Sequence, residues 1–180
     1  MSTIKTNQIQ TTAGKPILNS TGSVLQIVST DYSSTVSSTS GTPADVSGFS
    51  ATITPSSSSN KILVYVSVRF GAANDGYPYV ILKRNGTTIG SGNQATGSRI
   101  NTFLSFTQTA LGAGTAPYRA EQPSRMVLDS PASTSALTYQ IALASPYAGF
   151  TGYINRQDNQ NDAVYIQFPA SNITLMEISG

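Results

Sequence analysis

The stretch NKILVYVSVRF, residues 60–70, carries the clearest β-strand signal in the chain. Successive side chains of a strand point to opposite faces of the sheet. One face of this strand would therefore carry only apolar side chains, namely Ile62, Val64, Val66, Val68 and Phe70. The other face begins apolar, at Leu63 and Tyr65, and ends polar at Ser67 and Arg69. We expect the first face to be core and the second to be partly covered, by a neighbouring subunit or by a loop of the same chain.

Similar runs recur along the chain, separated by turns rich in Gly, Pro, Asn and Ser. The stretch TSALTYQIALAS, residues 134–145, alternates cleanly and predicts a strand with one core face. Further candidate strands are SVLQIVST, FSATITP, YPYVILKRNGTTIGSG, NTFLSFTQTAL, RMVLDS, FTGYIN, AVYIQFP and NITLMEI. No segment combines a sustained helical period with helix caps. The chain is therefore expected to be all-β, with a strand spacing that suits an antiparallel sandwich or barrel.

Two short stretches predict turns. Asn85-Gly86 lies between two strand-like runs, which predicts a hairpin with a type I′ turn. The serine run PSSSSNK, residues 55–61, is expected to be a surface turn, because it is too short for a domain linker and the strands on either side need each other to bury their apolar faces.

Residues 1–24 differ from the rest because they precede the first well-patterned strand. Their apolar residues are scattered among Thr, Asn and Gln, which does not match the unbroken apolar run of a secretory signal. We expect an extended arm over residues 1–24 and a single sandwich domain over residues 25–180. The arm would pair with strands of another subunit or of a larger particle, or would add an edge strand to its own sandwich. Its candidate anchoring residues are Ile4, Ile9, Ile17 and Leu18.

The composition excludes several kinds of chemistry. Charged residues are 10% of the 180 residues, against about 25% in typical soluble domains, and the net charge is +2. Without His or Cys the chain lacks the usual general base, the commonest metal ligand and any thiolate nucleophile. Only Lys83 and Arg84 are adjacent basic residues, so no nucleic-acid surface is expected. No cofactor, enzymatic activity or membrane insertion is expected, and the low charge favours a multimeric structural protein.

Two motif-like stretches match binding sites only superficially. GSGNQA, residues 90–95, fits a loose dinucleotide pattern, but TGSRI follows it where a helix would be needed. RQDNQND, residues 156–162, resembles a calcium loop, but Ala163 stands at the required Gly and Pro169 at the required Glu. We expect both stretches to be loops.

Tyrosine-bearing and Asn/Asp-rich loops are the candidate receptor contacts. Tyr77 and Tyr79 flank Pro78, and a tyrosine ring can stack on a sugar; the alternative is that Tyr79 packs in the sheet while Tyr77 covers its edge. The full candidate set is Tyr77, Tyr79, Arg156, Asp158 and Asp162. A glycoside hydrolase or lyase would instead need two acidic residues to converge in a cleft, drawn from Asp75, Asp129, Asp158 and Asp162.

The opening MSTIKTNQIQTTAGKPILNSTGSVLQIVST resembles the N-terminus of virion structural and tail-fibre-like proteins of tailed bacteriophages, particularly marine and cyanobacterial ones. The resemblance extends to ITPSSSSNKILVYVSV, to the Val-Ile-Leu strand leading into RNGTTIGSG, and to the terminal NITLMEI. The arrangement also resembles the jelly roll of C1q and tumour-necrosis-factor-like trimeric heads. This resemblance implies a jelly-roll-like sandwich displayed outward, with an N-terminal segment that attaches it to the particle or joins neighbouring chains.

These observations lead to the expectation of a non-enzymatic, homotrimeric virion protein that acts as a short tail fibre or adhesin and contacts a host-surface glycan. A capsid decoration protein is the first alternative, and a secreted carbohydrate-binding module is the second. The C-terminal strand is apolar on both faces, which suits a position beside a threefold axis. The candidate trimer-interface residues are Leu63, Tyr65, Ile173, Leu175, Met176 and Ile178.

Overall fold

The computed structural model describes residues 21–73, 76–94, 96–107, 119–146, 150–164 and 166–180. Within these ranges the secondary structure consists of strands and no helix occurs, as expected from the sequence. No helix able to cross a membrane is therefore found in the part of the chain that the structure describes. The strands are β1 (Val24–Tyr32), β2 (Val36–Ser38), β3 (Ala44–Ile53), β4 (Lys61–Ser67), β5 (Phe70–Ala72), β6 (Tyr79–Arg84), β7 (Thr87–Ile89), β8 (Leu104–Ser105), β9 (Ala120–Glu121), β10 (Ser124–Asp129), β11 (Leu137–Ala144), β12 (Gly152–Ile154) and β13 (Ser171–Ile178).

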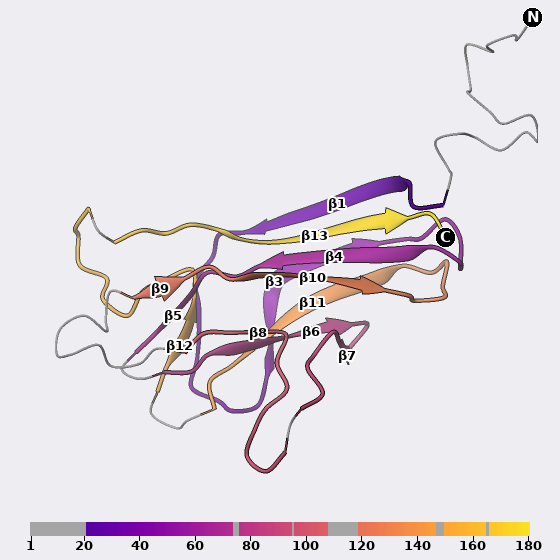
Figure 1. Cartoon of the computed structure of the whole chain (residues 1–180). Coiled ribbons are helices and arrows are strands. Elements are labelled where there is room, and N and C mark those ends of the chain that lie inside the picture. The colour runs from indigo at the N-terminus through magenta and orange to yellow at the C-terminus, as the bar shows by residue number, and fades with distance from the viewer. Residues whose placement is uncertain (1–20, 74–75, 95, 108–118, 147–149, 165) are drawn as a thin grey trace, which may run out of the picture.

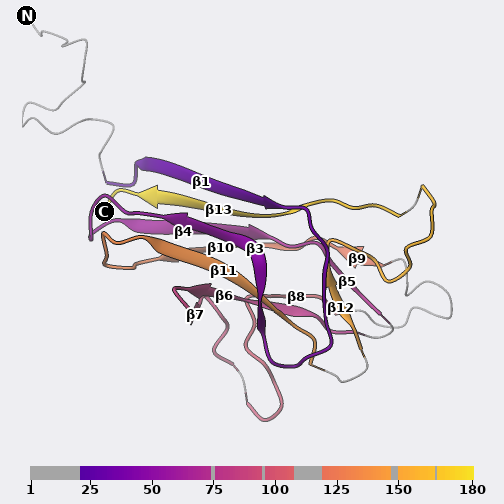
Figure 2. The ribbon, with the colours of Figure 1, turned by 180° about the vertical axis from the view of Figure 1, so that it is seen from behind.

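The strands form three antiparallel sheets. The first sheet has the order β1-β13-β4-β10, and the second has the order β3-β11-β6-β7 with β8 also paired to β6. These two sheets lie face to face as the layers of a β-sandwich (Figure 1). The third sheet, β2-β12-β5-β9, continues the first at one end, because β2 follows β1 along the chain, β5 follows β4, and β12 lies between β2 and β5 as β13 lies between β1 and β4. Figure 2 shows the same layers from behind.

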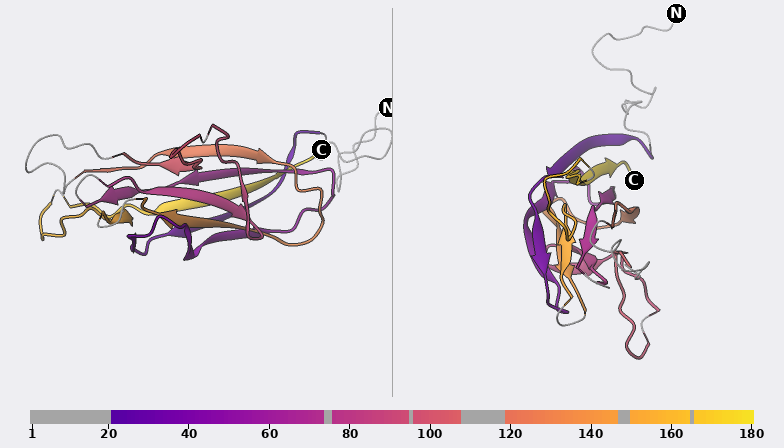
Figure 3. Two further views of the ribbon diagram at one scale, coloured as in Figure 1. Left: turned by 90° about the horizontal axis from the view of Figure 1, so that it is seen from below. Right: turned by 90° about the vertical axis from the view of Figure 1, so that its left-hand side faces the viewer.

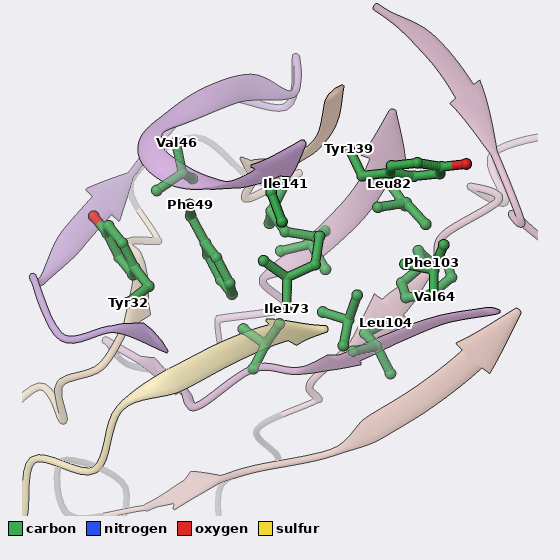
Figure 4. Packing of buried hydrophobic residues seen from close by; sticks show 14 of the residues in the cluster. Tyr32, Val46, Phe49, Val64, Leu82, Phe103, Leu104, Tyr139, Ile141 and Ile173 are labelled. Carbon is green, nitrogen blue, oxygen red and sulfur yellow. The ribbon is translucent and has the colours of Figure 1, made fainter. Parts of the chain in front are cut away.

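The core lies between the first and second sheets (Figure 4). The stretch 60–70 forms β4 and β5, and its predicted core face is fully buried from Ile62 to Phe70. The second sheet contributes Tyr139 and Ile141 from β11, which are also fully buried. Tyr32 stacks on Phe49 with ring centroids 4.9 Å apart. Because each large apolar side chain contributes about 1.5–3 kcal/mol when fully buried, this cluster accounts for the driving force of folding.

Two expectations need correction. Residues 163–169, which were expected to form a strand, are irregular wherever they are described. β11 does not have a single core face, because Ala142 is as fully buried as Ile141 beside it. The alternation of apolar and polar residues in the sequence shows which face of the strand is more apolar. It does not show whether other segments of the chain cover the opposite face.

The predicted hairpin is confirmed between β6 and β7. Asn85 and Gly86 have φ values of 47° and 83°, and two successive positive φ angles are the mark of a type I′ turn. The turn is also tied to the second sheet, since Asn85 Oδ1 accepts the backbone N–H of Thr138 at 2.8 Å.

The serine run 55–61 is a surface turn, as expected, and a buried carboxylate anchors it. Glu177 in β13 is 1% exposed and points inward. Its carboxylate oxygens accept hydrogen bonds from Gln26 Nε2 at 2.6 Å, from the Ser56 backbone N–H at 2.6 Å, from Ser56 Oγ at 2.8 Å and from Asn60 Nδ2 at 2.5 Å. Burial alone would raise the pKa of Glu177, but the hydrogen bonds from Gln26, Asn60 and Ser56 hold it below its usual value.

This anchor gives a pH-dependent contribution to stability. Because the pKa of Glu177 is lower in the folded chain than in the unfolded chain, its contribution is present above the unfolded value and is lost as pH falls through the folded one. We expect Glu177→Gln to lower the free energy of unfolding at pH 7 by about 1–3 kcal/mol, since the donors lose a charged acceptor. Urea unfolding at neutral and acidic pH measures this, and the variant should lose less stability on acidification than the wild type.

Glu121→Gln is the matched control, because Glu121 makes only an exposed ion pair with Arg119 at 2.8 Å. That variant should change stability by no more than about 0.5 kcal/mol. Equal effects of the two substitutions would contradict the anchoring role of Glu177.

Candidate functional site

The outward face of the first sheet carries an unbroken apolar row across all four strands. Ile27 of β1 is opposite Met176 of β13, Met176 is opposite Leu63 of β4, and Leu63 is opposite Leu128 of β10. Directly opposed residues of an antiparallel pair lie on the same face, with Cβ atoms about 4.5–5.5 Å apart. The four side chains therefore touch in sequence from one edge of the sheet to the other.

A second row lies beside the first. Ser29, Thr174, Tyr65 and Met126 are opposed in the same way, and Ser29 Oγ lies 2.8 Å from Thr174 Oγ1. The eight residues of the two rows include no charged side chain, and the nearest charges are Lys61 at one end of the face and Asp31 at the other. We call the apolar part of this surface the outer apolar face, which consists of Val24, Ile27, Leu63, Tyr65, Met126, Leu128, Met176 and Ile178.

The outer apolar face is exposed in the isolated chain. Ile27 and Met126 are each 60% exposed and Leu128 is 52% exposed. Single exposed apolar residues are common on soluble proteins, but a contiguous exposed patch marks a surface that contacts another molecule.

Four of the six residues predicted for a trimer interface lie on this face: Leu63, Tyr65, Met176 and Ile178. The other two were wrong, because Ile173 and Leu175 are fully buried in the core of their own chain. They alternate with Met176 along β13 and so point the other way. The sequence analysis missed Val24, Ile27, Met126 and Leu128, whose only available signal was the apolar character of the two strands that carry them.

The connection between β12 and β13, residues 155–170, lies at the opposite end of the molecule from Thr21, where the described chain begins. Thr21 lies beside the C-terminus, and the Gly22 N–H donates to the Ser179 carbonyl at 2.8 Å. Figures 1 and 3 show the connection at the other end of the long axis. We call residues 155–170 the distal loop. It exposes Val164 (96%) and Phe168 (59%) at its surface.

The two ends of the distal loop are clamped together. Ser171 Oγ donates to Asn155 Oδ1 at 2.7 Å and accepts the Arg69 backbone N–H at 2.9 Å. Asn155 Nδ2 donates to the carbonyls of Tyr32 and Ser34 at 2.5 and 3.0 Å. β12 and β13 occupy corresponding positions in the third and first sheets, so the loop leaves and rejoins one strand line. A loop whose ends meet in this way is an Ω-loop.

The candidate receptor residues of the distal loop form a local cluster. The Arg156 guanidinium lies 4.2 Å from the ring centroid of Tyr153 and donates to the carbonyls of Gln157 and Asp158. The Tyr153 hydroxyl donates to Asp158 Oδ1 at 2.9 Å. Burial of the hydroxyl is the larger cause that raises the pKa of Tyr153, and the Asp158 carboxylate is the second. Asp162 is exposed. The cluster shapes the base of the loop and leaves its outer part for contact.

The acidic residues considered for hydrolysis that the structure describes lie in two separate parts of the molecule, β10 and the distal loop. Both carboxylate oxygens of Asp129 accept hydrogen bonds from Arg84 Nη1 at 2.7 Å. Oδ2 of Asp129 also accepts a hydrogen bond from the Tyr139 hydroxyl at 2.7 Å. Asp158 lies in the distal loop, at the far end of the sandwich from Asp129 (Figure 1). Asp75 lies outside the described residues. Across the described ranges, no group of three acidic side chains is placed to hold a metal ion.

Two further groups complete the predicted set. Tyr77 and Tyr79 lie together beside a surface hollow, and the Tyr79 hydroxyl donates to the Gly41 carbonyl at 3.0 Å. The anchoring residues Ile4, Ile9, Ile17 and Leu18 lie outside the described residues.

Comparison with known proteins adds no assignment. Neither a scan against protein-family models nor a search of curated proteins gave a match. The functional argument therefore rests on the geometry of the outer apolar face, the distal loop and the hollow.

The clamp of the distal loop is testable by Ser171→Ala. The change removes one donor and one acceptor at a fully buried position, and leaves Asn155 Oδ1 and the Arg69 N–H without that partner. We expect a loss of about 1–3 kcal/mol in the free energy of unfolding and faster proteolysis within residues 155–170. Ser29→Ala, on the exposed face, should cost no more than about 0.5 kcal/mol. Unchanged proteolysis in Ser171→Ala would show that the clamp does not hold the loop.

Proposed function

We propose that this protein is a non-enzymatic structural protein of a tailed-phage virion, assembled as a homotrimer and displaying its β-sandwich outward as a short tail fibre or adhesin. The observation that carries the proposal is the outer apolar face, a four-strand surface without charge in its two central rows. The resemblance of the N-terminal stretch to phage tail-fibre-like proteins supplies the biological setting.

Self-association explains why this face is apolar. A closed ring of identical subunits removes such a face from water in every copy, whereas an open arrangement would leave one exposed at each end. Charge does not oppose the contact, because Lys61 and Asp31 lie at opposite ends of the face.

The outer apolar face is too small to act alone. Four strands about 4.8 Å apart and eight residues long at about 3.3 Å per residue cover roughly 400–500 Å². Stable interfaces bury about 800 Å² on each partner. The remaining area would have to come from residues outside the outer apolar face.

The strand order supports a jelly-roll head. β1 with β2, β4 with β5, β9 with β10, and β12 with β13 each follow one line through the first and third sheets. In the second sheet β7 and β8 pair with successive parts of β6 on the side away from β11, so they also follow one line. Counted in this way, the chain forms eight strand lines, four in each layer, as a jelly roll requires.

The placement of the distal loop at the far end of the sandwich from Thr21 favours a fibre or adhesin. Thr21, where the described chain begins, and the distal loop lie at opposite ends of the sandwich (Figure 1). Attachment through the residues before Thr21 would therefore direct the distal loop away from the particle. The exposed Val164 and Phe168 would then meet the host surface first. A capsid decoration protein, the alternative, would use the same arm on the capsid lattice.

The trimer is tested by Met126→Lys, which places a charge in the second row at a 60% exposed position and so spares the core. Size-exclusion chromatography with light scattering should give three times the chain mass of 18.8 kDa for the wild type and a smaller species for the variant. Val164→Lys adds the same charge on the distal loop and should leave the trimer intact. A wild-type monomer at micromolar concentration would overturn the proposal.

The virion location is tested by cross-linking mass spectrometry on intact particles, using the amines of Lys5 and Lys15. Links to tail or baseplate proteins are expected for a fibre. Links to the major capsid protein would replace the fibre assignment with a decoration protein, and absence of the protein from purified particles would remove both.

A further inference from the structure

A surface hollow of about 550 Å³ lies beside the second sheet, away from the outer apolar face. Four separate segments line it: Tyr77 and Tyr79 at the start of β6, the connection between β7 and β8, the residues around β8, and Pro146 after β11. Its volume falls within the roughly 300–1,000 Å³ typical of small-molecule sites. Because it lies on the other layer of the sandwich, assembly through the outer apolar face would leave it open.

One wall of the hollow is aromatic and rigid. Phe106 and Tyr79 are nearly fully buried, and Tyr79 is held by its bond to Gly41. Phe106 stacks parallel to Phe70 with centroids 6.4 Å apart. Burial raises the pKa of Tyr79, so its ring remains neutral at physiological pH. The half-buried Tyr77 completes this wall.

The rest of the lining is hydroxyl-rich and carries one charge. Four Ser or Thr residues line the hollow, among them the exposed Ser105 and Thr107. Arg99 is the single charged residue of the lining and is exposed. Among the described residues, the ion pairs join Lys83 to Asp45, Arg84 to Asp129 and Arg119 to Glu121, so none of them occupies Arg99.

We propose that this hollow binds a saccharide bearing a carboxylate group, with the apolar face of a sugar ring against Tyr77 and its carboxylate paired to Arg99. Aromatic rings bury the C–H face of a sugar, hydroxyl side chains exchange hydrogen bonds with ring hydroxyls, and a guanidinium pairs with a carboxylate through two parallel bonds. A purely apolar ligand would leave the hydroxyls unpaired, and a cation would be repelled by Arg99. The inference deepens the adhesive role proposed above and rests on it for its biological meaning, but the binding itself is measurable on the isolated protein.

The experiment compares two probes that differ only in the carboxylate: methyl β-D-glucuronide and methyl β-D-glucoside. Titration of each into the full-length protein, followed by calorimetry or ligand-observed NMR, should show tighter binding of the glucuronide by roughly two- to fivefold, the size of an ion pair at an exposed guanidinium. Equal affinity for the two probes would overturn the acidic class of ligand. Binding of neither at millimolar concentration would overturn the site.

Variants locate the binding in the hollow. Arg99→Gln should remove the preference for the glucuronide while leaving weak binding of both probes, and Tyr77→Ala should weaken both by about three- to tenfold. Tyr77→Phe keeps the ring and should retain binding. Lys61→Gln is the matched control for net charge, because it removes one exposed positive charge from the first sheet. An equal loss in Lys61→Gln and Arg99→Gln would show a general charge effect and refute the site.

The oligomeric state measured in the same samples separates the two proposals. Glucuronide binding by a protein that is monomeric, or that is missing from virions, would keep the site and remove the virion function. A virion-bound trimer that binds neither probe would keep the virion function and remove the saccharide site.

Discussion

The rest of the structure depends on the alternation of side chains along β13, which lies between β1 and β4 in the middle of the first sheet. Its inward residues are all buried and each meets a different need: Ser171 closes the distal loop, Ile173 and Leu175 fill the core, and Glu177 anchors the 55–61 turn. Its outward residues, including Met176, belong to the exposed face. A shift of one residue in its pairing would therefore move the core, the clamp and the anchor to solvent together.

The same sheet explains how a chain with few charges adopts one arrangement of strands. Its buried polar side chains are partnered by named donors and acceptors, as at Glu177 and Ser171, so they select one arrangement of strands. The described residues of the chain leave the outer apolar face exposed, and a contiguous exposed patch of this kind marks a surface that contacts another molecule.

The elongated sandwich keeps three kinds of contact apart. The chain emerges from the described structure at one end, the distal loop lies at the other, and the hollow beside Tyr77 opens on the second layer rather than on the outer apolar face. The three proposed contacts therefore do not compete for the same surface.

The sequence by itself determined the class of fold and much of the core, because a period of two is a local property. It predicted the buried face from Ile62 to Phe70 and the Asn85-Gly86 turn, and the structure confirms both. Only the tertiary structure decided which face of β13 is core, since that strand is apolar on both sides. It also decided which distant residues meet, such as Ile27 with Met176, because strand order and register depend on pairing between segments far apart in the chain.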